Sequence, residues 1–156
     1  MKEYTVCYMF DRRCHNVLFT RRRKPPYVEK LNGVGGKFEQ NETPEECVVR
    51  EVKEETGIEL TKNQLHKIVT IELPVDYAFD HETSVLHIFA AVIDESKVDY
   101  NTCEQLEWLD VDYILHAKPK DDCLAGDGEI PYIINLAVTY HGFGKKNNDT
   151  KVVPRK

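Results

Sequence analysis

The sequence has no long apolar run. Nowhere in its 156 residues is there an uninterrupted stretch of the roughly 18 apolar residues that a membrane helix needs. The first ten residues, MKEYTVCYMF, do not show the successive regions of a signal peptide. The sequence therefore predicts neither a membrane partner nor a secretory route.

The sequence also has few cysteines, and they are not paired in motifs. Their number is odd, no CxxC motif occurs, and they are scattered along the chain: Cys7, Cys14, Cys47, Cys103 and Cys123. This usage argues against a disulfide framework or a zinc site, and it favours reduced thiols in the cytoplasm.

An excess of positive charge is missing as well. The formal net charge is −6, which argues against nonspecific binding to long nucleic acid. It does not argue against a phosphorylated small molecule held through a metal ion. An apolar fraction of 41% and a charged fraction of 31% are those of a folded globular chain.

The order of apolar patterns predicts an α/β fold. Strands are predicted for the extended runs 4–10, 16–22, 65–73, 84–93 and 106–111. Apolar residues at helical spacing predict helices over 44–56 and 128–141, and a short helix is predicted near 112–117. The Pro- and Gly-rich segment 24–36 is predicted to be a loop. This order predicts an α/β/α sandwich with a mixed sheet. Residues 1–141 are expected to form one domain, and 142–156 a flexible basic tail. No oligomeric state is predicted.

The segment 42–55 is unusually acidic, and helix signals divide its charge. Thr43 and Glu46 form a capping-box pattern, Pro44 suits the first turn, and Gly57 is a typical stop signal. Asn41 tolerates a left-handed turn before the helix. The sequence therefore predicts a helix over 44–56.

Within that helix, Glu51, Glu54 and Glu55 fall in an arc of roughly 100°. One interpretation is a solvated face, but like charges at i,i+3 and i,i+4 destabilise a helix, and no cation on the same arc offsets them. The other interpretation is a site for a hard divalent cation such as Mg²⁺, which takes oxygen ligands. The glycines before the helix would add backbone carbonyls as ligands.

These residues carry a family resemblance. Gly36-x5-Glu42-x7-Arg50-Glu51-Val52-x-Glu54-Glu55-x-Gly57-Ile58 matches every specified position of the Nudix box, G-x5-E-x7-R-E-U-x-E-E-x-G-U, in which U is aliphatic. The chain thus resembles a Nudix hydrolase of the MutT type. The resemblance implies the Nudix fold and hydrolysis of a phosphoric anhydride bond in a nucleotide, with Mg²⁺ or Mn²⁺ as cofactor.

The resemblance also implies roles for the matching residues. The metal ligands would be Glu51, Glu54 and Glu55, with backbone from Gly35 and Gly36. Arg50 would orient the carboxylates, and Glu42 would tie the loop to the helix. Glu51 would position or deprotonate the water, with Glu54 as its rival for that role.

Relatives often supply one further carboxylate from outside the box. The candidates here are Glu104 and Glu107, which lie just before the tryptophan in the segment NTCEQLEWLDV. Glu104 is the preferred ligand, and the alternative is that both are exposed loop acids.

The segment Leu31–Lys37, LNGVGGK, resembles the corresponding segment of oxidised-purine nucleoside triphosphatases. It implies that Asn32 contacts a purine and that Lys37 lies at the substrate, although Asn32 also suits an ordinary turn. Arg22 could hold a phosphate. Asp127 lies where such relatives carry base-reading acids, or it belongs to a helix-initiating turn.

The resemblance and these residues give three candidate functions. The first is hydrolysis of a purine nucleoside triphosphate, such as 8-oxo-dGTP, to the monophosphate and pyrophosphate. The second is an ADP-ribose or other nucleotide-sugar diphosphatase, which Pro74 weakly favours. The third is a nucleotide sensor without catalysis, which the complete set of box glutamates disfavours.

Overall fold

One mixed sheet forms the centre of the chain. The computed structural model describes residues 1–25, 27–73, 83–102, 104–117, 123–126 and 128–143. Its strands are β1 (Lys2–Phe10), β2 (Asn16–Arg21), β3 (Leu31–Asn32), β4 (Val34–Lys37), β5 (His66–Leu73), β6 (Ser84–Val92) and β7 (Leu106–Asp110). The order is β3-β2-β1-β6-β5, with β4 paired to β1 and β7 to β2. The β1–β6 pair is parallel and the other pairs are antiparallel, which confirms the predicted mixed sheet.

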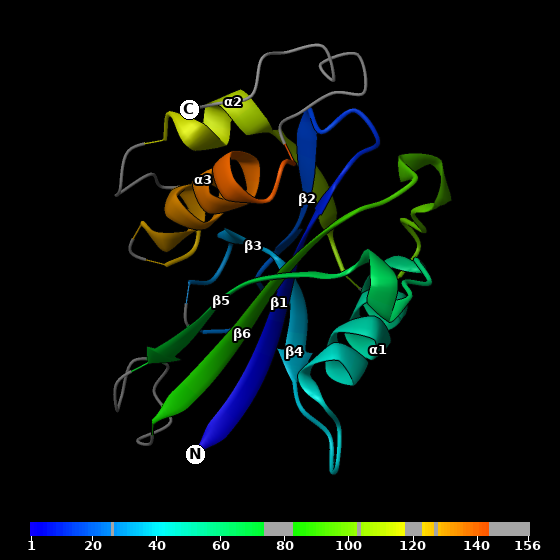
Figure 1. The fold of residues 1–156 in the computed structure, drawn as a ribbon, viewed down its shortest axis with the longest axis vertical. Helices are drawn as coiled ribbons and strands as arrows, with labels where there is room; N and C mark the ends of the chain where they lie inside the picture. Colours follow the sequence, from blue (N-terminus) through cyan, green and yellow to red (C-terminus); the bar gives the residue numbers. More distant parts are fainter. Residues whose placement is uncertain (26, 74–82, 103, 118–122, 127, 144–156) are drawn as a thin grey trace.

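Helices cover both faces of the sheet (Figure 1). Helix α1 (Pro44–Thr56) lies on one face, and α2 (Val111–Leu115) and α3 (Glu129–Tyr140) lie on the other. Alternation along β1 supplies both layers, because Tyr8 packs in the cluster with α3 and Met9 packs in the cluster with α1. The predicted α/β/α sandwich is confirmed. Two short 3₁₀ turns, η1 (Lys62–Gln64) and η2 (Glu95–Lys97), complete the described elements.

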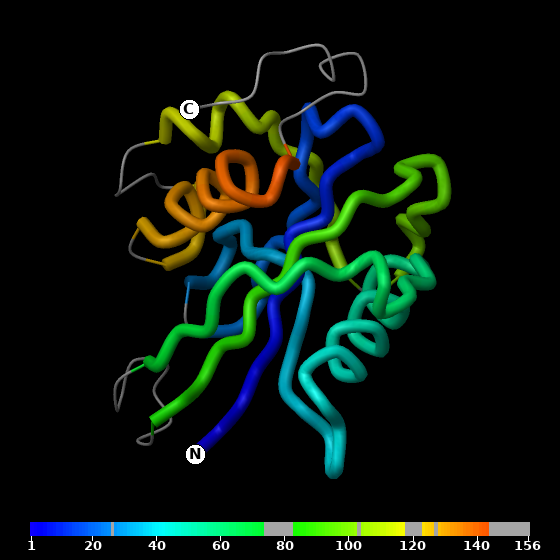
Figure 2. Tube along the Cα trace, in the orientation of Figure 1, coloured from blue at the N-terminus to red at the C-terminus, as the bar shows by residue number. Residues whose placement is uncertain are grey.

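Strand β1 changes partner along its length. Its first half pairs with β4, from Tyr4↔Lys37 to Cys7↔Val34, and its second half pairs with β2 at Met9↔Leu18. On its other edge it runs beside β6 throughout, as the tube in Figure 2 shows. Thr20 of β2 and the β4 glycines Gly35 and Gly36 contribute to the cavity described below.

The prediction of a loop over 24–36 was wrong at its end, because the chain forms β3 and β4 there. Gly35 explains the difference. A Cβ at this position would lie 2.0 Å from the Thr5 carbonyl oxygen, so only glycine lets the β4 backbone approach β1 this closely. Glycine content alone indicates a turn, so this strand pairing could not be predicted from composition.

The end of the described chain is packed onto the core. The Phe143 ring lies 4.8 Å from the Phe10 ring, centroid to centroid, and Phe143 is buried. The rest of the predicted tail, residues 144–156, lies outside the described residues. The same holds for Pro74, Cys103 and Asp127.

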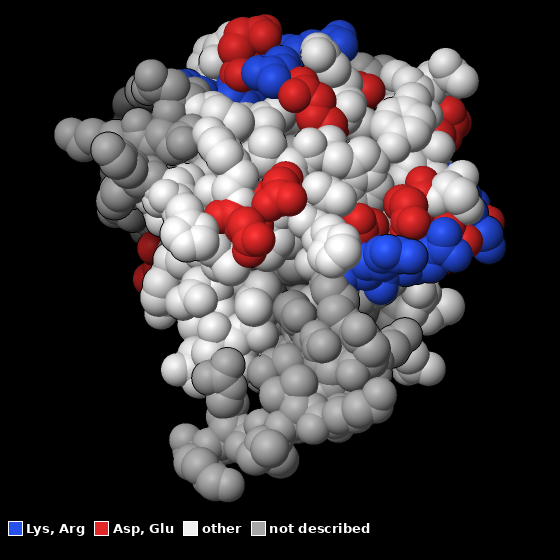
Figure 3. Space-filling model, turned by 90° about the horizontal axis from the view of Figure 1, so that it is seen from above, with Lys and Arg blue, Asp and Glu red and all other residues white. Residues whose placement is uncertain are grey.

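Charged side chains on the face shown in Figure 3 gather in groups separated by uncharged surface; the groups at the top and at the right mix both signs, and the group near the middle is acidic alone. One exposed contact between opposite charges is the pair of parallel hydrogen bonds, called a fork below, that the Arg12 guanidinium donates to the Glu95 carboxylate. Its Nε–Oε1 and Nη2–Oε2 distances are 3.2 Å each. Among the described helices, none is long and apolar enough to cross a membrane.

Candidate active site

Helix α1 starts and ends as its sequence predicts. The Thr43 hydroxyl accepts from the Glu46 N–H at 3.1 Å, and the Glu46 carboxylate accepts from the Thr43 N–H at 2.9 Å. Gly57 ends the helix in the left-handed region with φ 78°, and Asn41 has φ 65° before it. The capping box and both turn predictions are confirmed. On the helix so defined, Val48 and Val52 are buried against the sheet, and the box carboxylates lie on the neighbouring arc.

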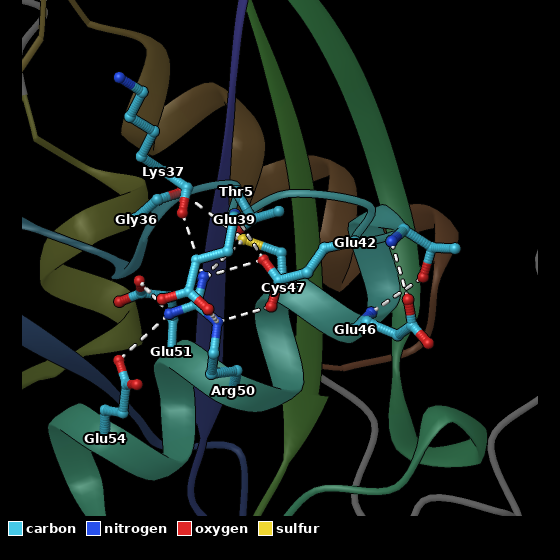
Figure 4. Close-up of polar contacts among 11 residues, drawn as sticks. Thr5, Gly36, Lys37, Glu39, Glu42, Glu46, Cys47, Arg50, Glu51 and Glu54 are labelled. Carbon is cyan, nitrogen blue, oxygen red and sulfur yellow. Dashed lines mark hydrogen bonds and ion pairs between the residues drawn. The ribbon is translucent and has the colours of Figure 1, made fainter.

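Arg50 is the centre of a network of carboxylates (Figure 4). Its guanidinium forms a fork with Glu42, donates to Glu51 at 2.8 Å and to Glu54 at 3.2 Å. It also donates to the Lys37 carbonyl at 3.1 Å. The sequence-based statement that no cation offsets the acidic arc was therefore wrong. The long Arg50 side chain extends along the helix surface to carboxylates on the neighbouring arc, and a helical wheel does not show this reach.

Glu42 closes the loop before the helix onto Arg50. Its side chain is only 14% exposed, and it also accepts from the Glu39 N–H at 2.8 Å. The hydrogen bonds from Arg50 lower the pKa of Glu42 from 4.5 to about 2. The predicted role of Glu42, joining loop to helix, agrees with these contacts.

This shift gives a prediction for acid unfolding. Because the folded-state pKa is lowered, the contribution of Glu42 to stability is full above about pH 4.5 and is lost as the pH falls to about 2. Thermal unfolding should show a gap between the wild type and Glu42→Gln that is constant near neutrality and closes toward pH 2. A gap of the same size at pH 2 would contradict the assignment. The exposed Glu59→Gln serves as the control.

Glu55 is partly buried and lies near two other carboxylates, Glu51 of the box and Glu104 outside it. Burial raises its pKa, and the hydrogen bond with Glu51 and the charges of Glu51 and Glu104 raise it further. A backbone hydrogen bond to Gly35 acts in the opposite direction. Three carboxylates from α1 and from the segment before β7 therefore approach one another, and each favours a cation among them.

Gly36 is needed beside this cluster. A Cβ at Gly36 would lie 2.6 Å from the Glu51 carboxylate carbon, so any side chain there would displace the carboxylate. The pair Gly35–Gly36 thus allows both the approach of β4 to β1 and the position of Glu51.

A cavity of ≈ 580 Å³ opens next to the cluster. Its residues fall into an acidic end (Glu55 and Glu104), a basic rim (Arg22, Arg23 and Lys24), a floor from β1 (Tyr4, Val6 and Tyr8), an apolar wall from β5, β6 and α3 (Ile71, Leu73, Leu86, Ile130 and Ile133), and polar groups that include Asn32 and Glu129. Such a combination suits a ligand with an anionic part and a flat, partly apolar part.

The polar side chains of the cavity have distinct environments. Burial lowers the pKa of the Arg22 guanidinium, with the Glu104 charge opposing this shift. Burial raises the pKa of Tyr8, and the Glu129 charge adds to the effect. The Asn32 Oδ1 accepts from the Gly33 N–H at 2.9 Å, which orients the amide.

The structure brings together most, but not all, of the predicted site residues. Those that line the cavity are Arg22, Asn32, Gly35, Gly36, Glu55 and Glu104. Glu51 lies beside them against Gly36 and Glu55. Glu54 is 57% exposed and bound to Arg50. The Lys37 side chain extends away from the network, and only its carbonyl takes part in it (Figure 4).

The structure also separates the two candidates for the extra carboxylate. Glu104 lines the cavity, whereas Glu107 forms a fork with Arg21, at 2.6 and 2.8 Å. Asp127 lies outside the described residues. Sequence reasoning missed Glu129, two residues further on, and the tyrosines of β1, Tyr4 and Tyr8, whose only signal was a four-residue spacing that places them on the same face of a strand.

No group of three or more His, Cys, Asp or Glu side chains in the described ranges is gathered at metal-ligand geometry. The reason is visible in the contacts, because Glu54 is turned toward Arg50 and Glu55 is bonded to Glu51. The donors themselves, which are carboxylates with repelling charges beside backbone, are the type that a hard divalent cation takes.

Comparison with known proteins gives the family. Residues 2–125 match the model of the NUDIX domain. An oxidized purine nucleoside triphosphate hydrolase of Danio rerio is 36% identical over 98 residues, which are 63% of this chain and 60% of that protein. An 8-oxo-dGTP diphosphatase of Escherichia coli (strain K12) is 37% identical over 76 residues, 47% of this chain and 59% of that protein. The matches thus span about three fifths of these relatives.

Solved structures share the fold. A MutT/nudix family protein from Enterococcus faecalis superposes with a TM-score of 0.69 at 20% identity, covering 88% of this chain and 62% of that one. The NUDIX domain of Shewanella oneidensis NrtR, solved with ADP ribose, gives a TM-score of 0.65 at 17% identity, covering 87% of this chain and 85% of that one.

Proposed function

Because the chain belongs to the NUDIX family, we propose that it is a pyrophosphohydrolase that uses a divalent metal ion, Mg²⁺ or Mn²⁺. Its substrate is a purine nucleoside triphosphate such as 8-oxo-dGTP, which it converts to the monophosphate and pyrophosphate. The observation that carries this proposal is the single cavity in which the acidic cluster, a basic rim and Asn32 meet.

The residues around the cluster fit a divalent cation by their donor type. Glu51, Glu55 and Glu104 would hold it, with Glu54 adjacent on α1 and with backbone from Gly35 and Gly36. When bound, the cation would neutralise negative charge on the phosphate oxygens of the substrate.

The chain's own residues supply the remaining steps. Arg50 holds Glu51 and Glu54 in place through its hydrogen bonds. Glu51 is assigned the task of positioning or deprotonating the attacking water, because Arg50 donates to one of its oxygens and so orients the carboxylate. Glu54 is the rival for this role. Arg22, in the basic rim, binds a phosphate group of the nucleotide's triphosphate.

Base recognition falls to polar groups that line the cavity, Asn32 and Glu129. With its Oδ1 engaged by the Gly33 N–H, the Asn32 amide can still donate to an exocyclic carbonyl oxygen of the base. The Glu129 carboxylate accepts from ring N–H groups. A guanine edge offers both kinds of partner, an acceptor oxygen and N–H donors side by side, on a two-ring base. We expect binding of a one-ring pyrimidine to depend less on Asn32.

Replacing Asn32 with alanine should therefore raise KM for purine triphosphates by about tenfold, and far less for pyrimidine triphosphates. Steady-state kinetics with GTP-type and CTP-type substrates measures this difference. Asn16→Ala, at the start of β2 and outside the cavity, is the control. Equal changes for both base classes would contradict a base-reading role.

The second candidate is an ADP-ribose diphosphatase. It is favoured by the fold shared with the NrtR domain solved with ADP ribose. A substrate panel separates the two: 8-oxo-dGTP, the normal dNTPs and NTPs, ADP-ribose and diadenosine polyphosphates, each with Mg²⁺. We expect the highest kcat/KM with a purine triphosphate. A clear preference for ADP-ribose would overturn the proposal in favour of the second candidate.

A further inference from the structure

The basic rim of the cavity belongs to the loop that connects β2 to β3, described at 22–25 and 27–30, and two residues of this loop have a positive φ. Arg22, Arg23 and Lys24 line the cavity from this loop, and Tyr27 lines it further along. Tyr27 has φ 64° and Glu29 has φ 69°, in the left-handed region that disfavours residues with a side chain. Such a conformation persists only where surrounding contacts hold it.

Backbone hydrogen bonds close the base of the loop. The Arg22 N–H donates to the Lys30 carbonyl at 2.8 Å, and the Glu29 N–H donates to the Arg22 carbonyl at 2.7 Å. These bonds set the register of the two ends. They leave the Glu29 carbonyl available to a partner outside the loop.

That partner is Arg21, the last residue of β2. Its Nη1 donates to the Glu29 carbonyl at 2.7 Å. Its Nε and Nη2 donate to the two carboxylate oxygens of Glu107 on β7 at 2.6 and 2.8 Å. The bidentate contact fixes the plane of the guanidinium, and the fixed plane directs Nη1 at the loop. Neither Arg21 nor Glu107 lines the cavity.

We propose that Arg21 is a positioning residue for substrate binding: held by Glu107, it keeps the left-handed Glu29 in place and so keeps Arg22, Arg23 and Lys24 at the cavity. Glu107 acts only through Arg21. The inference rests on the proposed function in one respect, since it takes the cavity as the nucleotide site.

Three variants test it: Arg21→Gln, Glu107→Gln and the double variant. Each single change should raise KM for the nucleoside triphosphate by about tenfold and change kcat by less than about threefold. The double variant should match Arg21→Gln alone, because Glu107 has no other route to the loop. Arg21→Lys, which keeps the charge without the fork, should also raise KM, and it serves if Arg21→Gln does not fold.

Glu95→Gln is the matched control. It breaks a similar fork, between Glu95 and Arg12, at a site outside the cavity. We expect its KM to equal that of the wild type. A rise in KM as large as that of Glu107→Gln would show a general effect of losing a surface fork and would overturn the inference.

Amide hydrogen exchange of Glu29 and Lys30 gives a readout that needs no substrate. Exchange should be faster in Arg21→Gln and Glu107→Gln and unchanged in Glu95→Gln. Unchanged exchange in both loop variants, or faster exchange with an unchanged KM, would overturn the positioning role. A wild type that hydrolyses no nucleotide would overturn the proposed function instead, and the Kd of a non-hydrolysable triphosphate would then replace KM.

Discussion

Replacing Glu55 with glutamine is expected to lower kcat by about a hundredfold or more while the chain stays folded. Glu55 lines the cavity near Glu51 and Glu104, and burial together with these neighbours raises its pKa. Glutamine has the shape of the neutral acid but cannot become an anion. It therefore preserves the packing and removes a negative charge that a divalent cation requires.

The folding side of this prediction can be measured separately. Because the pKa of Glu55 is raised in the folded chain, ionising it costs stability as the pH rises above its unfolded value of 4.5. Without metal, Glu55→Gln should unfold at the same temperature as the wild type or higher in neutral buffer. Glu59→Gln, at an exposed position after the same helix, should keep full activity. Near-normal turnover by Glu55→Gln at saturating Mg²⁺ would remove Glu55 from the metal site.

Replacing Arg50 with methionine should damage both stability and activity. Arg50 is 20% exposed, and it pairs with Glu42 and Glu51, each 14% exposed. Its removal leaves two mostly buried carboxylates without their cation, at a cost of about 3 kcal/mol. For a chain of this size, that cost corresponds to a fall in Tm of about 6–12 °C.

Activity should fall by more than about tenfold, because Glu51 and Glu54 lose the group that orients them. Calorimetry and steady-state kinetics measure the two effects. Arg12→Met is the control, since Arg12 is 61% exposed and exposed ion pairs of this kind contribute little to stability. An Arg50→Met protein as stable as Arg12→Met would contradict the central place of Arg50.

The parts of the fold that depend on local rules could be predicted from the sequence. Thr43, Glu46 and Gly57 define the ends of α1 through contacts within a few residues, and the structure forms each of them. The long strands followed from apolar runs in the same way. The family resemblance implied that Glu42 joins the loop to the helix, and the structure shows the contact that does so, the fork between Glu42 and Arg50.

Other features depend on residues far apart in the chain and could not be read from it. Strand β4 exists because Gly35 meets Thr5, thirty positions earlier, and glycine content alone indicates a loop. The choice between Glu104 and Glu107 depends on Arg21, which takes Glu107. Glu129 was not predicted as a site residue. It lines the cavity because α3 packs on the sheet, and that packing depends on the whole apolar core.

The most direct test of the central claim is to identify the products by ³¹P NMR. The chain is incubated with 8-oxo-dGTP and Mg²⁺, beside parallel samples of dGTP and ADP-ribose, and Glu55→Gln serves as the blank. The account predicts that a purine triphosphate yields pyrophosphate and the monophosphate, and that the blank yields neither. Release of inorganic phosphate with a nucleoside diphosphate, or hydrolysis of ADP-ribose with every triphosphate left intact, would contradict it.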